Sequence, residues 1–157
     1  MIGAIHQGYG QIRNIKRSSS LKLLPSKTLL WTKQQQPNAG ITVTNKLLKK
    51  YNGSTEYFIG ICYTNQMYDL TNYKTLRIKG TTGSHLTNRH YTTSMAFGYG
   101  TNLGDYNYHF NSWEKYWWVA TGTTFDIKAD LSSATGMKYI CFWAASGDFE
   151  INFVELS

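Results

Sequence analysis

Short stretches with alternating apolar and polar side chains recur about every ten residues along most of this chain, which limits its fold to a few classes. Such alternation turns one face of each stretch to a core and the other to water. The clearest stretches cover residues 41–44, 76–79, 95–99, 125–128 and 149–153. Residues 139–143 are apolar throughout, which predicts a strand in the middle of a sheet. Only residues 46–51 are compatible with one or two helical turns. We therefore expect an all-β fold, an antiparallel β-sandwich or jelly roll.

Two corner sequences share one pattern, an Asp followed by Leu and then Thr or Ser. Asp69-Leu70-Thr71 precedes the stretch at 76–79, and Asp130-Leu131-Ser132 precedes the stretch at 139–143. An Asp side chain that accepts hydrogen bonds from nearby backbone N–H groups stabilises such a turn, and the Leu closes the edge of the core. We expect both corners to be structural rather than catalytic.

The basic residues are concentrated at the start of the chain. Residues 1–55 contain nine Lys or Arg and no Asp or Glu, whereas residues 56–157 contain seven basic and nine acidic residues. A cluster of five cations lies in a segment without amphipathic period: Arg13, Lys16, Arg17, Lys22 and Lys27. We therefore predict an extended basic N-terminal arm over residues 1–27 and a β-sandwich domain over residues 28–157.

A basic arm is consistent with solvation alone, with docking on an acidic surface of another protein, or with nucleic acid. Nucleic-acid-binding domains spread basic residues over the folded body, and here the body is near neutral, which disfavours nucleic acid. No apolar run approaches the ~20 residues that span a bilayer, so we expect no membrane insertion. The first residues lack the charged start and apolar core of a secretory signal peptide, so we expect synthesis in the cytoplasm without export by the usual route.

Aromatic residues are dense between residues 97 and 118. Tyr116, Trp117 and Trp118 are consecutive and cannot all face inward from one strand, because side chains alternate between its faces. Flat aromatic faces with polar tips bind sugar rings and also anchor protein interfaces, so core packing, a subunit interface and a glycan platform all stay open. The candidate ligand or interface residues are Tyr106, Tyr108, Trp113, Tyr116, Trp117 and Trp118.

No residue pattern indicates catalysis. Sugar hydrolysis needs two carboxylates about 5–10 Å apart, one of them desolvated, and only Glu114 has an apolar sequence setting, where a rim carboxylate with a partner is the favoured interpretation. The four His residues lack metal-ligand spacing, and no nucleotide-binding or nucleophile motif occurs. We therefore expect a non-enzymatic protein without metal or cofactor. Cys62 and Cys141 lie in apolar stretches, which favours buried free thiols over a disulfide.

The order of several short motifs resembles a known family. The likeness is carried by Leu30-Trp31-Thr32, Asp69 to Leu76, Phe125-Asp126-Ile127, Asp130-Leu131-Ser132, Gly136 with Tyr139, and Ile151 to Leu156. Residues 29–157 are similar to the jelly-roll appendage domains of tail, baseplate and head-fibre proteins of tailed bacteriophages, which themselves resemble carbohydrate-binding modules. The resemblance implies a virion structural protein, displayed outward and attached to other virion subunits by its N-terminal arm, with host-surface glycans as a further partner. A stand-alone carbohydrate-binding module is the alternative.

The aromatic content also predicts self-association. Few charges, many aromatic residues and the apolar stretches 57–63 and 116–119 give more apolar surface than two sheets readily cover. Closed rings of identical subunits commonly bury such surface, and the resemblance implies a three-fold ring. We expect a charged replacement such as Trp117→Glu to split this homo-oligomer while the sandwich stays folded.

Overall fold

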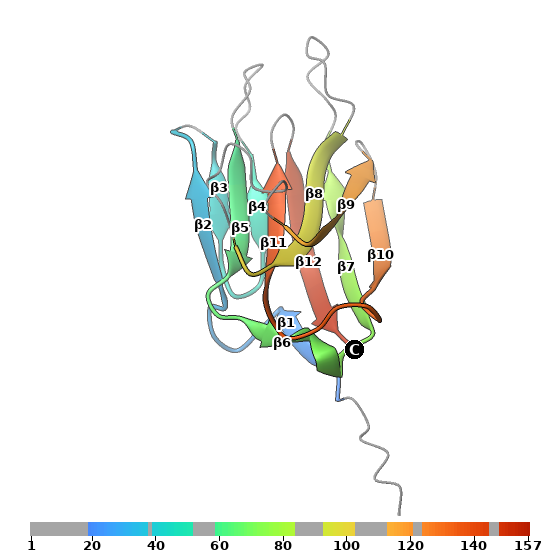
Figure 1. The fold of residues 1–157 in the computed structure, drawn as a ribbon. Coiled ribbons are helices and arrows are strands. Elements are labelled where there is room, and N and C mark those ends of the chain that lie inside the picture. The colour runs from blue at the N-terminus through green and yellow to red at the C-terminus, as the bar shows by residue number, and fades with distance from the viewer. Residues whose placement is uncertain are drawn as a thin grey trace, which may run out of the picture.

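The computed structural model describes residues 19–37, 39–51, 59–83, 93–102, 113–120, 124–144 and 148–157. Over these residues, two antiparallel sheets form the two layers of the fold, which confirms the predicted β-sandwich (Figure 1). The described residues include no helix that is long and apolar enough to cross a bilayer.

Each sheet has a path of five paired strands and one additional strand. Sheet A contains, in order, β10 (Thr124–Asp130), β7 (Thr75–Thr82), β12 (Phe149–Leu156), β4 (Leu48–Lys50) and β3 (Ile41–Val43), and β1 (Leu21–Leu24) also pairs with β12. Sheet B contains β2 (Trp31–Gln35), β5 (Gly60–Thr64), β11 (Met137–Ala144), β8 (Thr93–Gly100) and β9 (Lys115–Ala120), and β6 (Tyr68–Asp69) also pairs with β11. The chain crosses between the sheets repeatedly, so strands that are neighbours in a sheet come from distant parts of the sequence.

The main core lies between the two sheets, where the predicted alternation places it. Leu76 and Ile78 of β7 are fully buried, and Phe97 of β8 belongs to the same buried cluster. On β10, Phe125 is buried while Asp126 is exposed. The strand that is apolar on both faces, β11, lies in the middle of sheet B between β5 and β8, as predicted.

Both predicted Asp-Leu corners are confirmed. Asp69 caps a short 3₁₀ helix, η1 (Leu70–Asn72), by accepting a hydrogen bond from the Thr71 N–H at 3.1 Å. Asp130 accepts a hydrogen bond from the Ser132 N–H at 2.9 Å. Leu70 and Leu131, the Leu residues of the two corners, are fully buried.

Gly136 connects the two corners. Its φ of 74° lies in the left-handed region that favours glycine. Its N–H donates to Thr71 Oγ1 at 2.8 Å, and its carbonyl accepts from the Leu70 N–H at 3.0 Å. The turn before β11 is therefore tied to η1, and both corners lie at one end of the sandwich.

Two elements differ from the sequence expectation. Residues 48–50 form β4 rather than helical turns, because this segment pairs with β12 and β3 in sheet A. In β12, a bulge between Ile151 and Phe153 inserts one extra residue, so the strand changes face there. Ile151 is fully buried, whereas Phe153 faces outward instead of continuing the buried row.

The sheet begins earlier than the predicted arm boundary at residue 27. β1 pairs with β12, with Leu21 opposite Leu156 and Leu24 opposite Val154. Leu23 and Leu24 are fully buried, and the Leu23 carbonyl accepts a hydrogen bond from Trp31 Nε1 at 3.0 Å. Residues 21–24 are therefore part of the sandwich.

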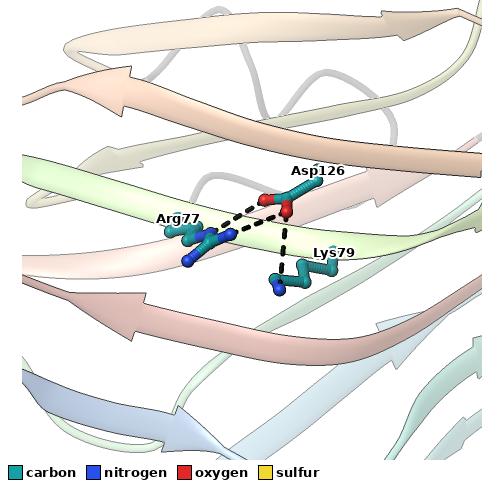
Figure 2. A network of polar contacts seen from close by, with 3 residues as sticks. All are labelled: Arg77, Lys79 and Asp126. Atoms are coloured by element: carbon teal, nitrogen blue, oxygen red, sulfur yellow. Dashed lines mark hydrogen bonds and ion pairs between the residues drawn. The ribbon is translucent and has the colours of Figure 1, made fainter.

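The outer face of sheet A is polar and carries paired charges. Arg77 donates two hydrogen bonds to the Asp126 carboxylate, at 2.8 and 2.7 Å, and Lys79 Nζ lies 3.4 Å from the same carboxylate (Figure 2). The cations of Lys22, Arg77 and Lys79 lie 5.1–5.9 Å from the centre of the Phe153 ring. Phe153 is thus covered by cations rather than by a second sheet.

Candidate functional site

The outer face of sheet B differs from that of sheet A because it carries aromatic and apolar residues. Cross-strand register defines two rows that run over all five strands of the path. The first row is Thr32, Tyr63, Cys141, Gly98 and Tyr116. The second row is Gln34, Ile61, Trp143, Ala96 and Trp118. Each row therefore runs from a polar side chain on β2 to an aromatic ring on β9.

The middle of this face is buried and its β9 edge is exposed. Ile61, Ala96 and Cys141 are fully buried and form a second apolar cluster, separate from the main core. By contrast, Tyr116 is 40% exposed and Trp118 is 44% exposed. We call these two side chains the β9 aromatic pair.

The three consecutive aromatic residues of β9 alternate between the two faces of sheet B, as predicted from the sequence. Trp117 faces the main core and stacks on Phe97, with ring centroids 5.2 Å apart and planes at 20°. Tyr116 and Trp118 face outward and contact each other edge to face at 5.8 Å. The expectation that one face of this strand presents aromatic surface is confirmed.

Small residues on β8 let the larger rings lie across it. A Cβ atom at Gly98 would lie 2.8 Å from Trp113 Cε3, so only glycine leaves room for the Trp113 ring there. Trp118 and Trp143 meet across Ala96, which lies between them in register, with ring centroids 6.0 Å apart. The floor of the face is thus formed by Ala96 and Gly98.

The outward rings are oriented nearly perpendicular to one another. The interplanar angle is 84° for Tyr116 and Trp118, and 77° for Trp118 and Trp143. Tyr63 and Tyr139, on β5 and β11, meet at 83° with centroids 6.3 Å apart. Edge-to-face contacts of this kind join the positive edge of one ring to the negative face of the next.

The structure divides the six predicted aromatic candidates into three groups. Tyr106 and Tyr108 lie outside the described residues. Trp113 and Trp117 pack into the two apolar clusters. Tyr116 and Trp118 are the exposed pair.

Three aromatic residues of this face were not among the candidates: Tyr63, Tyr139 and Trp143. Tyr139 and Trp143 lie two positions on either side of Cys141 in the all-apolar stretch, and both face outward with it. The signal that could have found them is the period of two within that stretch, because every second residue of a central strand faces away from the main core. The sequence alone does not show which residues of this all-apolar stretch face the main core and which face outward, because that depends on the register of β11.

The carboxylate beside the face has a partner. Glu114 Oε1 accepts a hydrogen bond from Lys138 Nζ at 2.6 Å, and its side chain is 42% exposed. This agrees with the favoured interpretation of a paired rim carboxylate. Among the residues that the structure describes, no group of three His, Cys, Asp or Glu is placed to hold a metal ion. His6, His85, His90 and His109 lie outside the described residues.

The two cysteines are free thiols, as the sequence favoured. Phe142 pairs with Cys62 and Cys141 pairs with Tyr63, so the two thiols lie on adjacent strands but face opposite sides of sheet B. Burial raises the pKa of Cys62 to about 12 and also raises the pKa of Cys141. Both thiols are therefore packing residues rather than nucleophiles.

The predicted arm cations are only partly described. Arg13, Lys16 and Arg17 lie outside the described residues. Lys22 is on β1, where its Nζ lies 5.5 Å from the Phe153 ring centre, and Lys27 is exposed in the turn before β2. The structure therefore places Lys22 on the outer face of sheet A and away from the β9 aromatic pair.

No protein-family model matches this chain, and no curated protein matches it significantly. Solved structures with a similar fold include the K1 cleaved adhesin domain of Lys-gingipain from Porphyromonas gingivalis W83. Its sequence is 14% identical, the match covers 91% of this chain and 92% of that chain, and the TM-score is 0.46. The exoplasmic/lumenal domain of VIP36 is also similar. Its Ca²⁺/Man3GlcNAc-bound form has 10% identity, covers 90% of this chain and 89% of that chain, and has a TM-score of 0.48. Its Ca²⁺-bound form has 10% identity, covers 90% of each chain and has a TM-score of 0.49.

Proposed function

We propose that this chain is a carbohydrate-binding domain and that the β9 aromatic pair on the outer face of sheet B is its site. The observation that carries the proposal is that Tyr116 and Trp118 lie together, 40% and 44% exposed, next to a floor that is fully buried. One face of a pyranose ring presents C–H groups, which pack on an aromatic face, while its hydroxyls point outward to polar partners. Thr32 and Gln34, in the same rows on β2, are exposed polar side chains at the opposite edge of the sheet.

The size of the exposed surface favours a small ligand over a subunit interface. An aromatic side chain offers about 150–250 Å² of surface, so the β9 aromatic pair leaves on the order of 200 Å² open. A specific protein interface buries about 800 Å² on each partner. The described part of this face therefore supplies too little apolar surface for a stable subunit interface, and enough for a sugar ring. Self-association stays a prediction from the sequence.

We propose binding without catalysis. The carboxylate next to the pair, Glu114, is engaged by Lys138 Nζ at 2.6 Å, which supports a role in holding the surface rather than in proton transfer. Hydrolysis of a glycosidic bond would require a second carboxylate within about 10 Å of the first.

A glycan array probed with the full chain tests the proposal. We expect binding that Tyr116→Ala and Trp118→Ala each weaken by about tenfold or more, because a lost ring contact of ~1.4 kcal/mol changes the affinity tenfold. Tyr51→Ala is the matched control, because Tyr51 is 63% exposed and directly follows β4, a strand of sheet A. Equal losses in all three variants, or no binding to any glycan, would contradict the proposal.

The virion assignment is a second proposal, and it rests on the resemblance described above. One structural observation supports an anchoring role for the N-terminal segment. β1 pairs with β12 from Leu21 onward, so a partner that bound residues 1–18 would be attached directly to the sandwich. Deletion of residues 1–18 is the appropriate test, since it spares β1. We expect the shortened protein to fold and to be absent from assembled particles. Unchanged incorporation of the shortened protein into particles would contradict the virion assignment.

A further inference from the structure

We infer that the corner between Tyr116 and Trp118 recognises one sugar ring, at the end or at a branch of a soluble glycan, rather than the flat face of an insoluble polysaccharide. This inference rests on the proposed carbohydrate binding and specifies its ligand class. It is carried by the orientation of the rings, which is independent of their exposure.

A flat polysaccharide surface needs several aromatic rings that lie in one plane. Tyr116 and Trp118 instead meet at 84°, so at most one of them lies parallel to any flat ligand. The other ring then stands as a wall at the edge of the first. A sugar that stacks on one ring meets this wall with its own edge, so the glycan cannot extend across the wall and cannot be part of a flat surface that covers both rings.

The perpendicular arrangement is held in place by packing. Trp118 contacts Tyr116 on one side and Trp143 on the other, and Trp143 is only 4% exposed. Turning Trp118 into the plane of Tyr116 would break its edge-to-face contact with Trp143. Ala96 leaves the space below Trp118 in which this contact forms. The corner is therefore part of the folded state and does not depend on a ligand.

The contrast with the core shows that the perpendicular geometry is specific to the outer face. Among the residues that the structure describes, the ring contacts of the outer face lie between 77° and 84°. The ring contacts between described residues of the main core have smaller interplanar angles, from 20° for Phe97 with Trp117 to 52° for Tyr99 with Trp117. The core rings of sheet B are therefore stacked or tilted, whereas the described rings of its outer face meet edge to face.

Two measurements on the full chain test the inference. The first is an array of soluble mono- and oligosaccharides, and the second is adsorption to microcrystalline cellulose and to chitin powder. We expect affinities on the array that agree within about threefold among glycans with the same terminal or branch sugar, whatever their length. Adsorption to either powder should not exceed that of Trp118→Ala.

The outcomes separate the inference from the proposed function. Adsorption to cellulose or chitin that falls about tenfold in both Tyr116→Ala and Trp118→Ala would overturn the corner while carbohydrate binding stands. Affinity that rises about tenfold with each added sugar would do the same, because it requires an extended row of subsites. Binding to neither the array nor the powders, with the same result for Tyr51→Ala, would overturn both the inference and the function.

Discussion

Trp117 and Trp118 are adjacent in the chain and lie on opposite faces of sheet B. Trp117 stacks on Phe97 in the main core, whereas Trp118 is 44% exposed on the outer face. We expect Trp117→Ala to lower the free energy of unfolding by about 2–4 kcal/mol, because it removes a packed ring from the core. Trp118→Ala removes a ring that is already 44% exposed in the folded state and should therefore cost less than Trp117→Ala. Urea denaturation of the two variants measures this difference, and equal stability of both would contradict the assignment of faces.

The same pair of residues corrects the expected test of self-association. Trp117→Glu would place a charge against Phe97 and destabilise the sandwich, so a loss of assembly in this variant would not report on an interface alone. Trp118→Glu is the informative variant because its side chain faces outward. If the protein is an oligomer through this face, light scattering of Trp118→Glu should show a folded monomer. A monomeric wild type at high micromolar concentration would remove the support for self-association.

The sequence predicted the parts of the fold that depend on local patterns. The period-two stretches became β3, β7, β8 and β10, and the two Asp-Leu corners formed because an Asp side chain satisfies backbone donors within two residues of itself. What the sequence did not predict depends on pairing at long range. β1 has only four residues, and its pairing with β12 makes it a strand. The outward position of Phe153 follows from one extra residue in β12, which no local pattern reveals.

The candidate site was only half predictable for the same reason. The run Tyr116 to Trp118 had to expose a ring on some face, because alternation forbids three inward side chains in a row. Which ring is exposed depends on the register of β9 against β8, where Trp117 pairs with Phe97 and Trp118 with Ala96. Trp143 joins the site from β11, and its distance in sequence conceals this relationship.

Truncation at two positions should separate the basic segment from β1. Deletion of residues 1–18 spares every described strand, so we expect an unfolding free energy within about 1 kcal/mol of wild type. Deletion of residues 1–27 removes Leu23 and Leu24, which are fully buried. The burial of two Leu side chains contributes about 3–6 kcal/mol, a large part of the stability of a typical domain. Chemical denaturation and limited proteolysis compare the two, and a stable product lacking residues 1–27 would show that β1 is dispensable.

Gly98 is expected to be intolerant of any side chain. A Cβ atom there would lie 2.2 Å from the Lys115 carbonyl oxygen and 2.8 Å from Trp113 Cε3, so β9 or the Trp113 ring must move. We expect Gly98→Ala to destabilise the protein by about 1–3 kcal/mol and to change the tryptophan fluorescence. Gly83→Ala is the matched control, because its nearest neighbour would be the Asp148 Cβ at 3.2 Å, an atom that needs to shift only slightly. Equal effects of the two substitutions would argue against the close approach of Trp113 to β8.

Asp126 should contribute stability that is lost in acid. The pKa of Asp126 is lowered from 3.8 to about 2, and the hydrogen bonds from Arg77 are the largest cause of this shift. A folded-state pKa below the unfolded value gives stability that is present above about pH 4 and is lost as the pH falls to about 2. We therefore expect Asp126→Asn to lower the thermal midpoint at pH 7 and to match wild type near pH 2. Added salt should reduce the difference, because the pair is exposed. A deficit that is the same at both pH values would show that the charge is not its origin.

Unlike the charge of Asp126, the charge of Lys50 should lower the stability of the folded protein. Lys50 lies on β4 opposite Phe149 and is fully buried, beside a cavity of about 180 Å³ that is also lined by Asp148 and Thr82. Burial lowers the pKa of Lys50 from 10.5 to about 8, and the charge of Asp148 only partly opposes this effect. The folded state therefore disfavours the ammonium form.

The pH dependence of stability should reveal this group once other titrations are subtracted. Between about pH 8 and 10.5 the unfolded chain keeps the Lys50 proton and the folded protein does not, so the contribution of Lys50 to stability rises with pH. The two buried thiols act in the reverse direction, because their raised pKa values make the unfolded state lose protons first above about pH 9. Comparison with Lys50→Met removes the thiol contribution, since both proteins share it.

We expect Lys50→Met to be more stable than wild type by about 1–3 kcal/mol at pH 7, because a neutral side chain of similar length avoids the cost of burying a charge. This advantage should shrink as the pH rises from 8 to 10.5, because the folded protein no longer carries the buried charge, and it should be smallest above about pH 10.5, where the wild-type amine is neutral in both states. Lys49→Met is the matched control. The Lys49 side chain is 45% exposed and its Nζ lies 3.8 Å from Glu150 Oε2, so replacing it should change the free energy of unfolding by less than about 1 kcal/mol at every pH. Guanidinium titrations of the three proteins at several pH values measure the differences. A gap between wild type and Lys50→Met that stays constant from pH 7 to 10.5 would mean that Lys50 keeps its charge in the folded protein, held by a partner strong enough to offset its burial.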